Sequence, residues 1–271
     1  MSNQVTDKVA VVLGARGGTG KQLVHRLSEN PAFKKIRAVV RDASAVDPAS
    51  IFPADDRIET LSGDVTKPDS LRAAFEGATH IFNVTSGSLS RSGAVVAAVD
   101  RDGVGATAAL AAEVCGSGLE RYLLVSSQLV HNSNKWNPIR VMLNNMATGP
   151  FASKGLMDLK WEGEEKLRHC DPCVPYTIVR PGRLGDGPLG STSVIVGQTN
   201  ANYDSGNATT RADLAAACVA AALAENTLNT TFELSTAKAE SSDSVAEGKT
   251  LPVPEDIFSD LKPRYLENHT S

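Results

Sequence analysis

Three glycines at three-residue spacing follow directly on a short apolar run near the start of the chain. Residues 8–13 are mostly apolar and β-branched, which is typical of a parallel strand covered on both faces. Residues 21–27 carry apolar side chains at helical spacing, and residues 36–40 form a second apolar run. A strand, a glycine loop, a helix and a second strand in this order predict a βαβ unit. The loop consists of Gly14, Ala15, Arg16, Gly17, Gly18, Thr19 and Gly20.

The position of this loop predicts that it binds the phosphates of a dinucleotide. In such loops the first glycine makes a tight turn, the second lets the backbone approach a pyrophosphate, and the third allows the helix to pack closely on the strand. The helix that follows presents free N–H groups and the positive end of its dipole. Glycines at this spacing also occur in ordinary turns, so the flanking strands and helix carry the prediction.

Strand-like and helix-like segments alternate along the rest of the chain. We expect one α/β domain over residues 1–271, with a doubly wound parallel sheet of the Rossmann type. We expect residues 128–160 and a small C-terminal segment within 183–271 to contribute to the substrate pocket. Residues 128–150 are predicted as a loop. The polar stretch 237–250 is predicted as a surface loop. Predicted strands lie at 57–61, 80–84, 121–127, 176–180 and 231–235, and predicted helices at 68–75, 95–116, 154–168 and 211–225.

The charge balance and the cysteine count narrow the class of partner. The net charge is −4, which gives no support for nucleic acid or an anionic membrane, because either requires clustered Lys and Arg. The sequence contains no signal-peptide pattern and no apolar run long enough to span a bilayer. Four cysteines in 271 residues do not form a disulfide framework. We therefore expect a cytoplasmic protein that acts on a small-molecule substrate.

Two further motifs stand late in the chain. Residues 176–184 are Tyr-Thr-Ile-Val-Arg-Pro-Gly-Arg-Leu, and residues 211–215 are Arg-Ala-Asp-Leu-Ala. Together with the spacing of the glycine loop, they resemble the atypical, NmrA-like, NAD(P)H-binding branch of the short-chain dehydrogenase/reductase superfamily. The resemblance covers most of the chain, and it implies a nicotinamide cofactor.

This resemblance also implies positions for the rest of the cofactor site. Asp64 and Val65 would border the adenine, and residues 83–85 would line the cofactor after the fourth strand. Ser126 and Ser127 resemble the serine pair that ends the fifth strand, although they have the alternative role of capping that strand. The predicted cofactor residues are Gly14, Ala15, Arg16, Gly17, Gly18, Thr19, Gly20, Arg41, Asp64, Val65, Asn83, Val84, Thr85, Ser126, Lys160 and Pro181.

The end of the second predicted strand favours NADP over NAD. An acidic residue at this place binds the ribose 2′-hydroxyl of NAD, whereas a basic residue binds the 2′-phosphate of NADP. Arg41 stands there, and Arg16 in the glycine loop reaches the same region. A guanidinium group matches a phosphate in a bidentate way. Asp42 leaves an alternative, in which it pairs with Arg41, and a solvated surface arginine is another.

The usual catalytic acid is absent. Standard members of the superfamily use a Tyr-x-x-x-Lys pair with a serine that polarises the carbonyl. Lys160 resembles the family lysine, but Leu156 stands four residues earlier, and leucine cannot exchange a proton. The candidate catalytic residues are therefore Lys160, Ser127, its neighbour Ser126 and, as a nearby acid, Asp158. Lys160 has the alternative role of a solvated helix residue.

Three hypotheses for the function follow. In the first, which we favour, the protein is a reductase for a carbonyl, quinone or flavin and works without the tyrosine. In the second, the bound cofactor serves an isomerisation or a cyclisation. In the third, the protein is a redox sensor that binds NADP(H) without turnover and signals to a protein partner. Fold alone does not decide between them.

Other residues have weaker functional interpretations. Cys170 and Cys173 form a Cys-x-x-Cys pair, but no second Cys or His pair accompanies them at metal-site spacing. Trp136, Met142 and Met146 either line a substrate pocket or make packing contacts. We expect no metal site.

Overall fold

An eight-stranded sheet forms the centre of the protein in the computed structural model, which describes residues 7–150, 152–191, 194–199, 208–236 and 257–263. The strand order is β3-β2-β1-β4-β5-β6-β10-β8. All neighbours pair in parallel except β8, which runs antiparallel to β10 at one edge. A separate pair is formed by β7 (Leu184–Gly185) and β9 (Thr209–Thr210). The sheet strands are β1 (Lys8–Leu13), β2 (Phe33–Val40), β3 (Ile58–Ser62), β4 (His80–Asn83), β5 (Arg121–Val125), β6 (Tyr176–Pro181), β8 (Val194–Gly197) and β10 (Thr230–Thr236).

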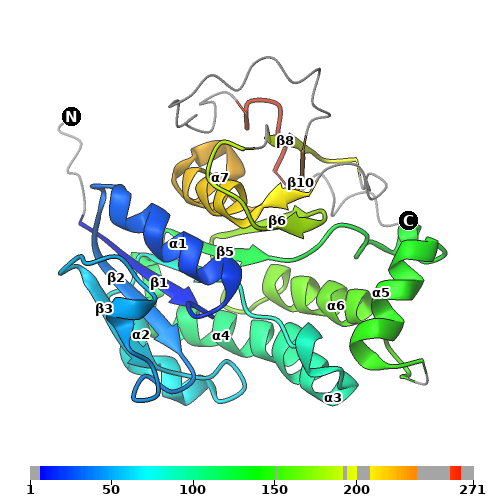
Figure 1. The fold of residues 1–271 in the computed structure, drawn as a ribbon, viewed down its shortest axis with the longest axis horizontal. Coiled ribbons are helices and arrows are strands. Elements are labelled where there is room, and N and C mark those ends of the chain that lie inside the picture. The colour runs from blue at the N-terminus through cyan, green and yellow to red at the C-terminus, as the bar shows by residue number, and fades with distance from the viewer. Residues whose placement is uncertain (1–6, 151, 192–193, 200–207, 237–256, 264–271) are drawn as a thin grey trace.

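Helices cover both faces of the sheet, which confirms the doubly wound architecture (Figure 1). One face carries α1 and α7, which pack against each other, and the other carries α2, α4 and α6. The helices are α1 (Gly18–Glu29), α2 (Arg72–Phe75), α3 (Gly93–Val96), α4 (Val104–Cys115), α5 (Pro138–Thr148), α6 (Leu156–Arg168) and α7 (Arg211–Leu223).

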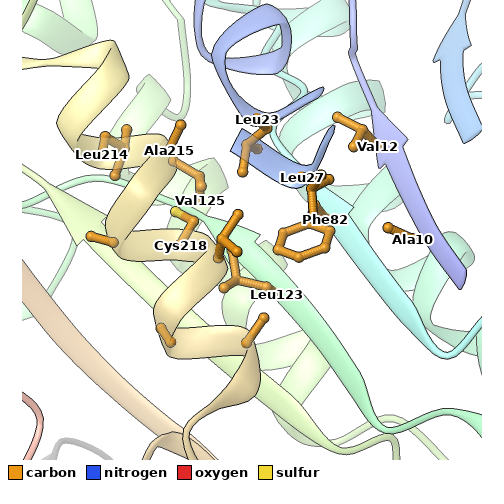
Figure 2. Packing of buried hydrophobic residues seen from close by; sticks show 14 of the residues in the cluster. Ala10, Val12, Leu23, Leu27, Phe82, Leu123, Val125, Leu214, Ala215 and Cys218 are labelled. Atoms are coloured by element: carbon orange, nitrogen blue, oxygen red, sulfur yellow. The ribbon is translucent and has the colours of Figure 1, made fainter. Parts of the chain in front are cut away.

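Alternation along the strands explains the two cores. Within β1, Ala10 and Val12 face one layer, whereas Val11 and Leu13 face the other. All four side chains are buried, as expected for a strand covered on both faces. Figure 2 shows the layer beneath α1 and α7, where Leu23, Leu27, Leu214, Ala215 and Cys218 meet Ala10, Val12, Phe82, Leu123 and Val125.

The strand order places the candidate site at the carboxyl ends of the central strands. The chain runs outward from β1 to β2 and β3, and then returns to β4 on the other side of β1. The carboxyl ends of β1 and β4 therefore flank the point where the order reverses, which is where open α/β sheets bind ligands. The glycine loop follows β1, and residues 83–85 follow β4.

Two predictions about local structure were wrong. Residues 128–150 are not a loop throughout, because Asn137 caps the N-terminus of α5 and Pro138 occupies its first turn. The predicted helix over 95–116 is divided by a π-helical segment, Ala97–Gly103. The predicted parallel sheet is confirmed, with β8 as an antiparallel strand at its edge. The predicted surface loop 237–250 lies outside the described residues, and so does much of the C-terminal segment. Within the described part of the chain, no helix has the length and apolar character needed to cross a bilayer.

Candidate dinucleotide-binding and catalytic site

The glycine loop forms a cradle that side chains would fill. Gly14 has φ +84°, in the left-handed region that favours glycine, and a Cβ there would lie 3.1 Å from Cγ2 of Thr85. A Cβ on Gly20 would lie 2.2 Å from the Gly14 carbonyl oxygen, so only glycine lets α1 approach β1 this closely. Gly17 is the N-cap of α1 and provides no side-chain cap. The first N–H groups of α1 therefore remain open to a phosphate.

The other residues of the loop complete this arrangement. The buried Ala15 donates its N–H to the carbonyl of Val39 at 3.1 Å, which ties the loop to β2. Arg16 and Gly18 are exposed, and Thr19 is half-buried in the first turn of α1. The loop therefore has a fixed backbone and an open outer surface, which fits the pyrophosphate of a dinucleotide.

Asn83 and Thr85 fix the loop after β4 next to the cradle. The buried Asn83 side chain donates to the Tyr122 hydroxyl at 2.9 Å, and it accepts the N–H and the hydroxyl of Thr85 at 3.1 and 2.7 Å. Burial raises the pKa of Tyr122 to about 12. Asn83 thus positions Thr85, while Val84 and Thr85 are half-exposed beside the cradle.

Arg16 in the glycine loop and Arg41 after β2 are the two arginines predicted to bind a 2′-phosphate, and both are exposed. Neither Arg16 nor Arg41 forms an ion pair with another described residue. The Asp42 carboxylate accepts the N–H and the hydroxyl of Ser44 at 3.0 and 2.6 Å, and these bonds hold the pKa of Asp42 below its usual value. The structure therefore does not contain the alternative ion pair between Asp42 and Arg41.

Asp64 and Pro181 take part in short-range hydrogen bonds at two of the predicted cofactor positions, and Val65 lies beside Asp64. Asp64 accepts the N–H and the hydroxyl of Thr66 at 2.9 and 2.8 Å, and it is half-exposed. Val65 is buried. Pro181 ends β6, and its carbonyl accepts the N–H of Gln128 at 2.9 Å. Their contact with a cofactor stays a prediction.

Lys160 forms a buried ion pair that the sequence did not predict. Its Nζ lies 2.7 Å from Oδ1 of Asp100, and the two side chains are 11% and 1% exposed. The other oxygen of Asp100 accepts the N–H of Gly87 at 2.7 Å, so Asp100 connects Lys160 with the loop after β4. Lys160 is therefore not a solvated helix residue. The pair lines a small cavity with Thr85, Val104, Leu124, Val125 and Ser126.

An unusual backbone brings Asp100 to Lys160. Asp100 lies in the π-helical segment Ala97–Gly103, and such segments occur frequently at functional sites. A Cβ on Gly163 would lie 2.1 Å from the carbonyl oxygen of Asp100, so this glycine allows α6 to approach the segment. Sequence reasoning missed Asp100 because the π-helical turn interrupts the helical period and because Lys160 lies 60 residues away.

Ser126 is the second polar group of the cavity. Its buried hydroxyl has no hydrogen-bond partner among the described residues. Burial alone would raise the pKa of the neighbouring Glu164, but Arg180 and Arg168 lower it to about 2. Ser127 is half-buried and does not line the cavity. The structure therefore brings Ser126, rather than Ser127, together with Lys160.

Leu156 is a packing residue in the position of the family tyrosine. It is 7% exposed and belongs to an apolar cluster, so no proton donor occupies this place. The cluster also contains Val96, Val130, Ala147, Met157 and Leu159.

Asp158 is separate from the cavity. Its carboxylate accepts from Arg140 at 2.6 Å and from the N–H of Gly155 at 2.9 Å, so it caps α6. The buried Arg140 also donates to the carbonyls of residues 129–131, at 2.8, 3.0 and 2.6 Å. Asp158 and Arg140 thus join α6 to the loop after β5, and a role of Asp158 in proton transfer stays a prediction.

The other candidates are three exposed apolar residues and two cysteines that form no disulfide with each other. Trp136, Met142 and Met146 are exposed, at 85%, 52% and 64%, so they do not pack in the core. Cys170 and Cys173 are free cysteines.

Comparison with known proteins identifies relatives of the chain and structures with a similar fold. Over 225 residues the chain is 29% identical to the uncharacterized sugar epimerase YhfK of Bacillus subtilis, a match that covers 82% of this chain and 92% of that protein. The fold is similar to the oxidoreductase ylbE of Lactococcus lactis, with a TM-score of 0.65, 19% identity, and coverage of 84% of this chain and 91% of that one.

A further structure with this fold contains a cofactor. It is a short-chain dehydrogenase/reductase of the wide type from Veillonella parvula in complex with NADP, with a TM-score of 0.61 and 17% identity over 84% of this chain and 94% of that one. The family model described as NAD(P)H-binding matches residues 14–225, from the first glycine of the cradle to beyond the end of α7. The chain therefore belongs to the NAD(P)H-binding family, with the Rossmann fold of the short-chain dehydrogenases and reductases.

Proposed function

We propose that this protein binds NADP(H) and transfers hydride to a small organic acceptor, a carbonyl, quinone or flavin, without a catalytic tyrosine. The exposed Arg16 and Arg41 support the preference for NADP(H), because neither guanidinium has an ionic partner among the described residues. A phosphate group bound between them would gain charge-assisted hydrogen bonds that NAD(H) cannot make.

The observation that carries this proposal is the position of Thr85. Thr85 contacts Gly14 in the cradle, and it also lines the cavity that contains Lys160 and Ser126. A dinucleotide whose pyrophosphate lies on the cradle would therefore extend its nicotinamide end toward this cavity. The Lys160 ammonium would bind the nicotinamide ribose, which is the role that its resemblance to the superfamily lysine implies.

The residues of the cavity limit the chemistry. When bound, the nicotinamide supplies the hydride. The hydroxyl of Ser126 can donate a hydrogen bond to an acceptor oxygen, and Asp100 holds Lys160 in place. Leu156 keeps its side of the site apolar but supplies no proton. A flavin or a quinone suits such a site, because solvent can protonate these acceptors after hydride transfer.

Turnover tests this proposal. Purified protein is mixed with NADPH and a panel of flavins, quinones and carbonyl compounds, and loss of the reduced-nicotinamide absorbance is followed. We expect oxidation with at least one acceptor and a slower rate for Lys160→Ala. Tight binding of NADPH with no oxidation by any acceptor would favour a redox sensor, and a protein partner that distinguishes NADP+ from NADPH would then support that function.

An isomerisation is the second candidate, because the relative from Bacillus subtilis carries the name of a sugar epimerase. In this case the cofactor would supply reversible hydride transfer at a sugar carbon, and the proton of the sugar hydroxyl would leave to solvent and return from it. The test is incubation of sugars and sugar nucleotides with the NADP+-bound protein, followed by analysis of the stereochemistry. Formation of an epimer without net NADPH would favour this candidate over the reductase.

A further inference from the structure

Arg211 lies directly against the glycine cradle, although it comes from a distant part of the chain. It is the first residue of α7, after the N-cap Thr210. A Cβ on Gly18 would lie 2.8 Å from Cδ of Arg211 and 2.9 Å from its Nε. Gly18 does not have a positive φ, so its backbone does not require glycine. The absence of a side chain at Gly18 instead leaves room for Arg211 over the start of α1.

The electrostatic surroundings of Arg211 favour an anion. Its guanidinium lies near the N-termini of both α1 and α7, and each helix presents the positive end of its dipole there. Arg211 forms an ion pair with Asp186, whose Oδ1 is 2.7 Å from Nη1 of Arg211. Asp186 is 90% exposed, and ion pairs with such exposed groups contribute little to stability. Arg211, itself 31% exposed, is therefore available to another anion.

The family membership identifies the anion. The NAD(P)H-binding family match includes both the cradle and Arg211, and the first N–H groups of α1 lack a side-chain cap. Arg211 and Arg41 approach this cradle from different sides, because α7 packs over β5 and β6 whereas Arg41 follows β2. The 2′-phosphate is expected on the side of Arg41. The dinucleotide anion within reach of Arg211 is the pyrophosphate.

We propose that Arg211 binds the pyrophosphate of the cofactor, and that its pair with Asp186 is the state that the nucleotide replaces. The inference rests on dinucleotide binding and is independent of hydride transfer. It adds a cation from α7 to a cradle that otherwise consists of backbone groups. Because NAD(H) and NADP(H) share the pyrophosphate, Arg211 contributes equally to both.

Binding measurements separate this role from that of Arg41. The dissociation constants for NADPH and NADH are measured by calorimetry for the wild type, Arg211→Gln and Arg41→Gln. We expect Arg211→Gln to weaken both nucleotides by the same factor, about tenfold or more, because a hydrogen bond to a charged group is lost. Arg41→Gln, the matched control, should weaken NADPH and leave NADH unchanged.

Asp186→Asn provides a second and opposite test. It removes the competing carboxylate, so both nucleotides should bind up to about fivefold more tightly. Melting temperatures of the unliganded variants check that each one is folded.

The outcomes that overturn the proposal are distinct. An unchanged NADH affinity in Arg211→Gln would show that Arg211 does not bind the pyrophosphate, and so would a loss confined to NADPH. Weaker binding by Asp186→Asn would show that the ion pair builds the site rather than competing with the ligand. Wild-type protein that binds neither nucleotide would contradict the proposed function as well.

Discussion

The cradle and the Lys160 cavity are neighbours, but they are built in opposite ways. The cradle consists of backbone between β1 and α1, and its shape depends on the absence of side chains at Gly14 and Gly20. The cavity consists of side chains from separate elements, with Asp100 from a π-helical segment and Lys160 from α6. The backbone of the cradle is therefore encoded locally, whereas the polar groups around the expected reaction depend on tertiary contacts.

A single methyl group in the cradle should have the largest effect. In Gly20→Ala the new Cβ would lie 2.2 Å from a backbone carbonyl oxygen, so the loop or α1 must shift, and we expect no measurable binding of NADPH or NADH. Calorimetric titration checks this result. Gly118→Ala is the matched control, because a Cβ there meets nothing within 4 Å, and it should bind like the wild type. Normal binding by a folded Gly20→Ala protein would contradict a cradle made of backbone.

Breaking the ion pair of the cavity should reduce stability instead. Asp100→Asn leaves the Lys160 ammonium without its buried counter-charge, and we expect a loss of about 3 kcal/mol in the free energy of unfolding. Denaturant titration measures it.

The control for this pair is the double variant Asp100→Asn/Lys160→Met, which removes both charges and should recover much of the lost stability. If Asp100→Asn changed the free energy by less than about 0.5 kcal/mol, the pair would not be the buried contact that the structure contains.

The two regions also differ in how far the sequence predicted them. The spacing of the glycines and the flanking apolar runs are local, so they predicted β1, the loop and α1, and the alternation of segments predicted a doubly wound parallel sheet. The pair of Asp100 with Lys160 was not predictable, because a π-helical turn breaks the period and the contact is distant in sequence. Helix α5 was missed for another reason, since Asn137 and Pro138 indicate a turn as readily as a helix start.

Changing the arginine after β2 should alter nucleotide preference without disturbing the cradle. Arg41→Ala removes a partner of the expected 2′-phosphate, so NADPH should bind about tenfold more weakly while NADH is unaffected. Titration with both nucleotides checks this prediction. An equal loss for the two would mean that Arg41 does not select NADP(H).

Mild acid should reduce the stability of the protein through His80, which lies at the opposite end of the sheet from the cradle. Burial lowers the pKa of His80, at the start of β4, to about 4 from an ordinary value of 6.5. The folded protein thus resists protonation that the unfolded chain accepts, and its stability is full above pH 6.5 and falls as the pH drops from 6.5 toward 4. Between pH 6.5 and 5.5 we expect a loss of about 1 kcal/mol.

The matched variant for this titration is His80→Gln, which should show a smaller slope of unfolding free energy against pH. NADH affinity should hardly change in the same interval, because His80 lies at the amino end of β4 and the cradle lies at the carboxyl ends of the strands. A fall in affinity that parallels the fall in stability would contradict this separation.

The most direct measurement is a single-turnover reaction of the NADPH-bound protein with flavin, quinone and carbonyl acceptors. If the cavity beside the cradle is a hydride-transfer site, NADPH is oxidised by at least one acceptor, and Lys160→Ala slows that step while the protein still binds nucleotide. Saturating NADPH that stays reduced with every acceptor, or a rate that is unchanged in Lys160→Ala, would contradict it.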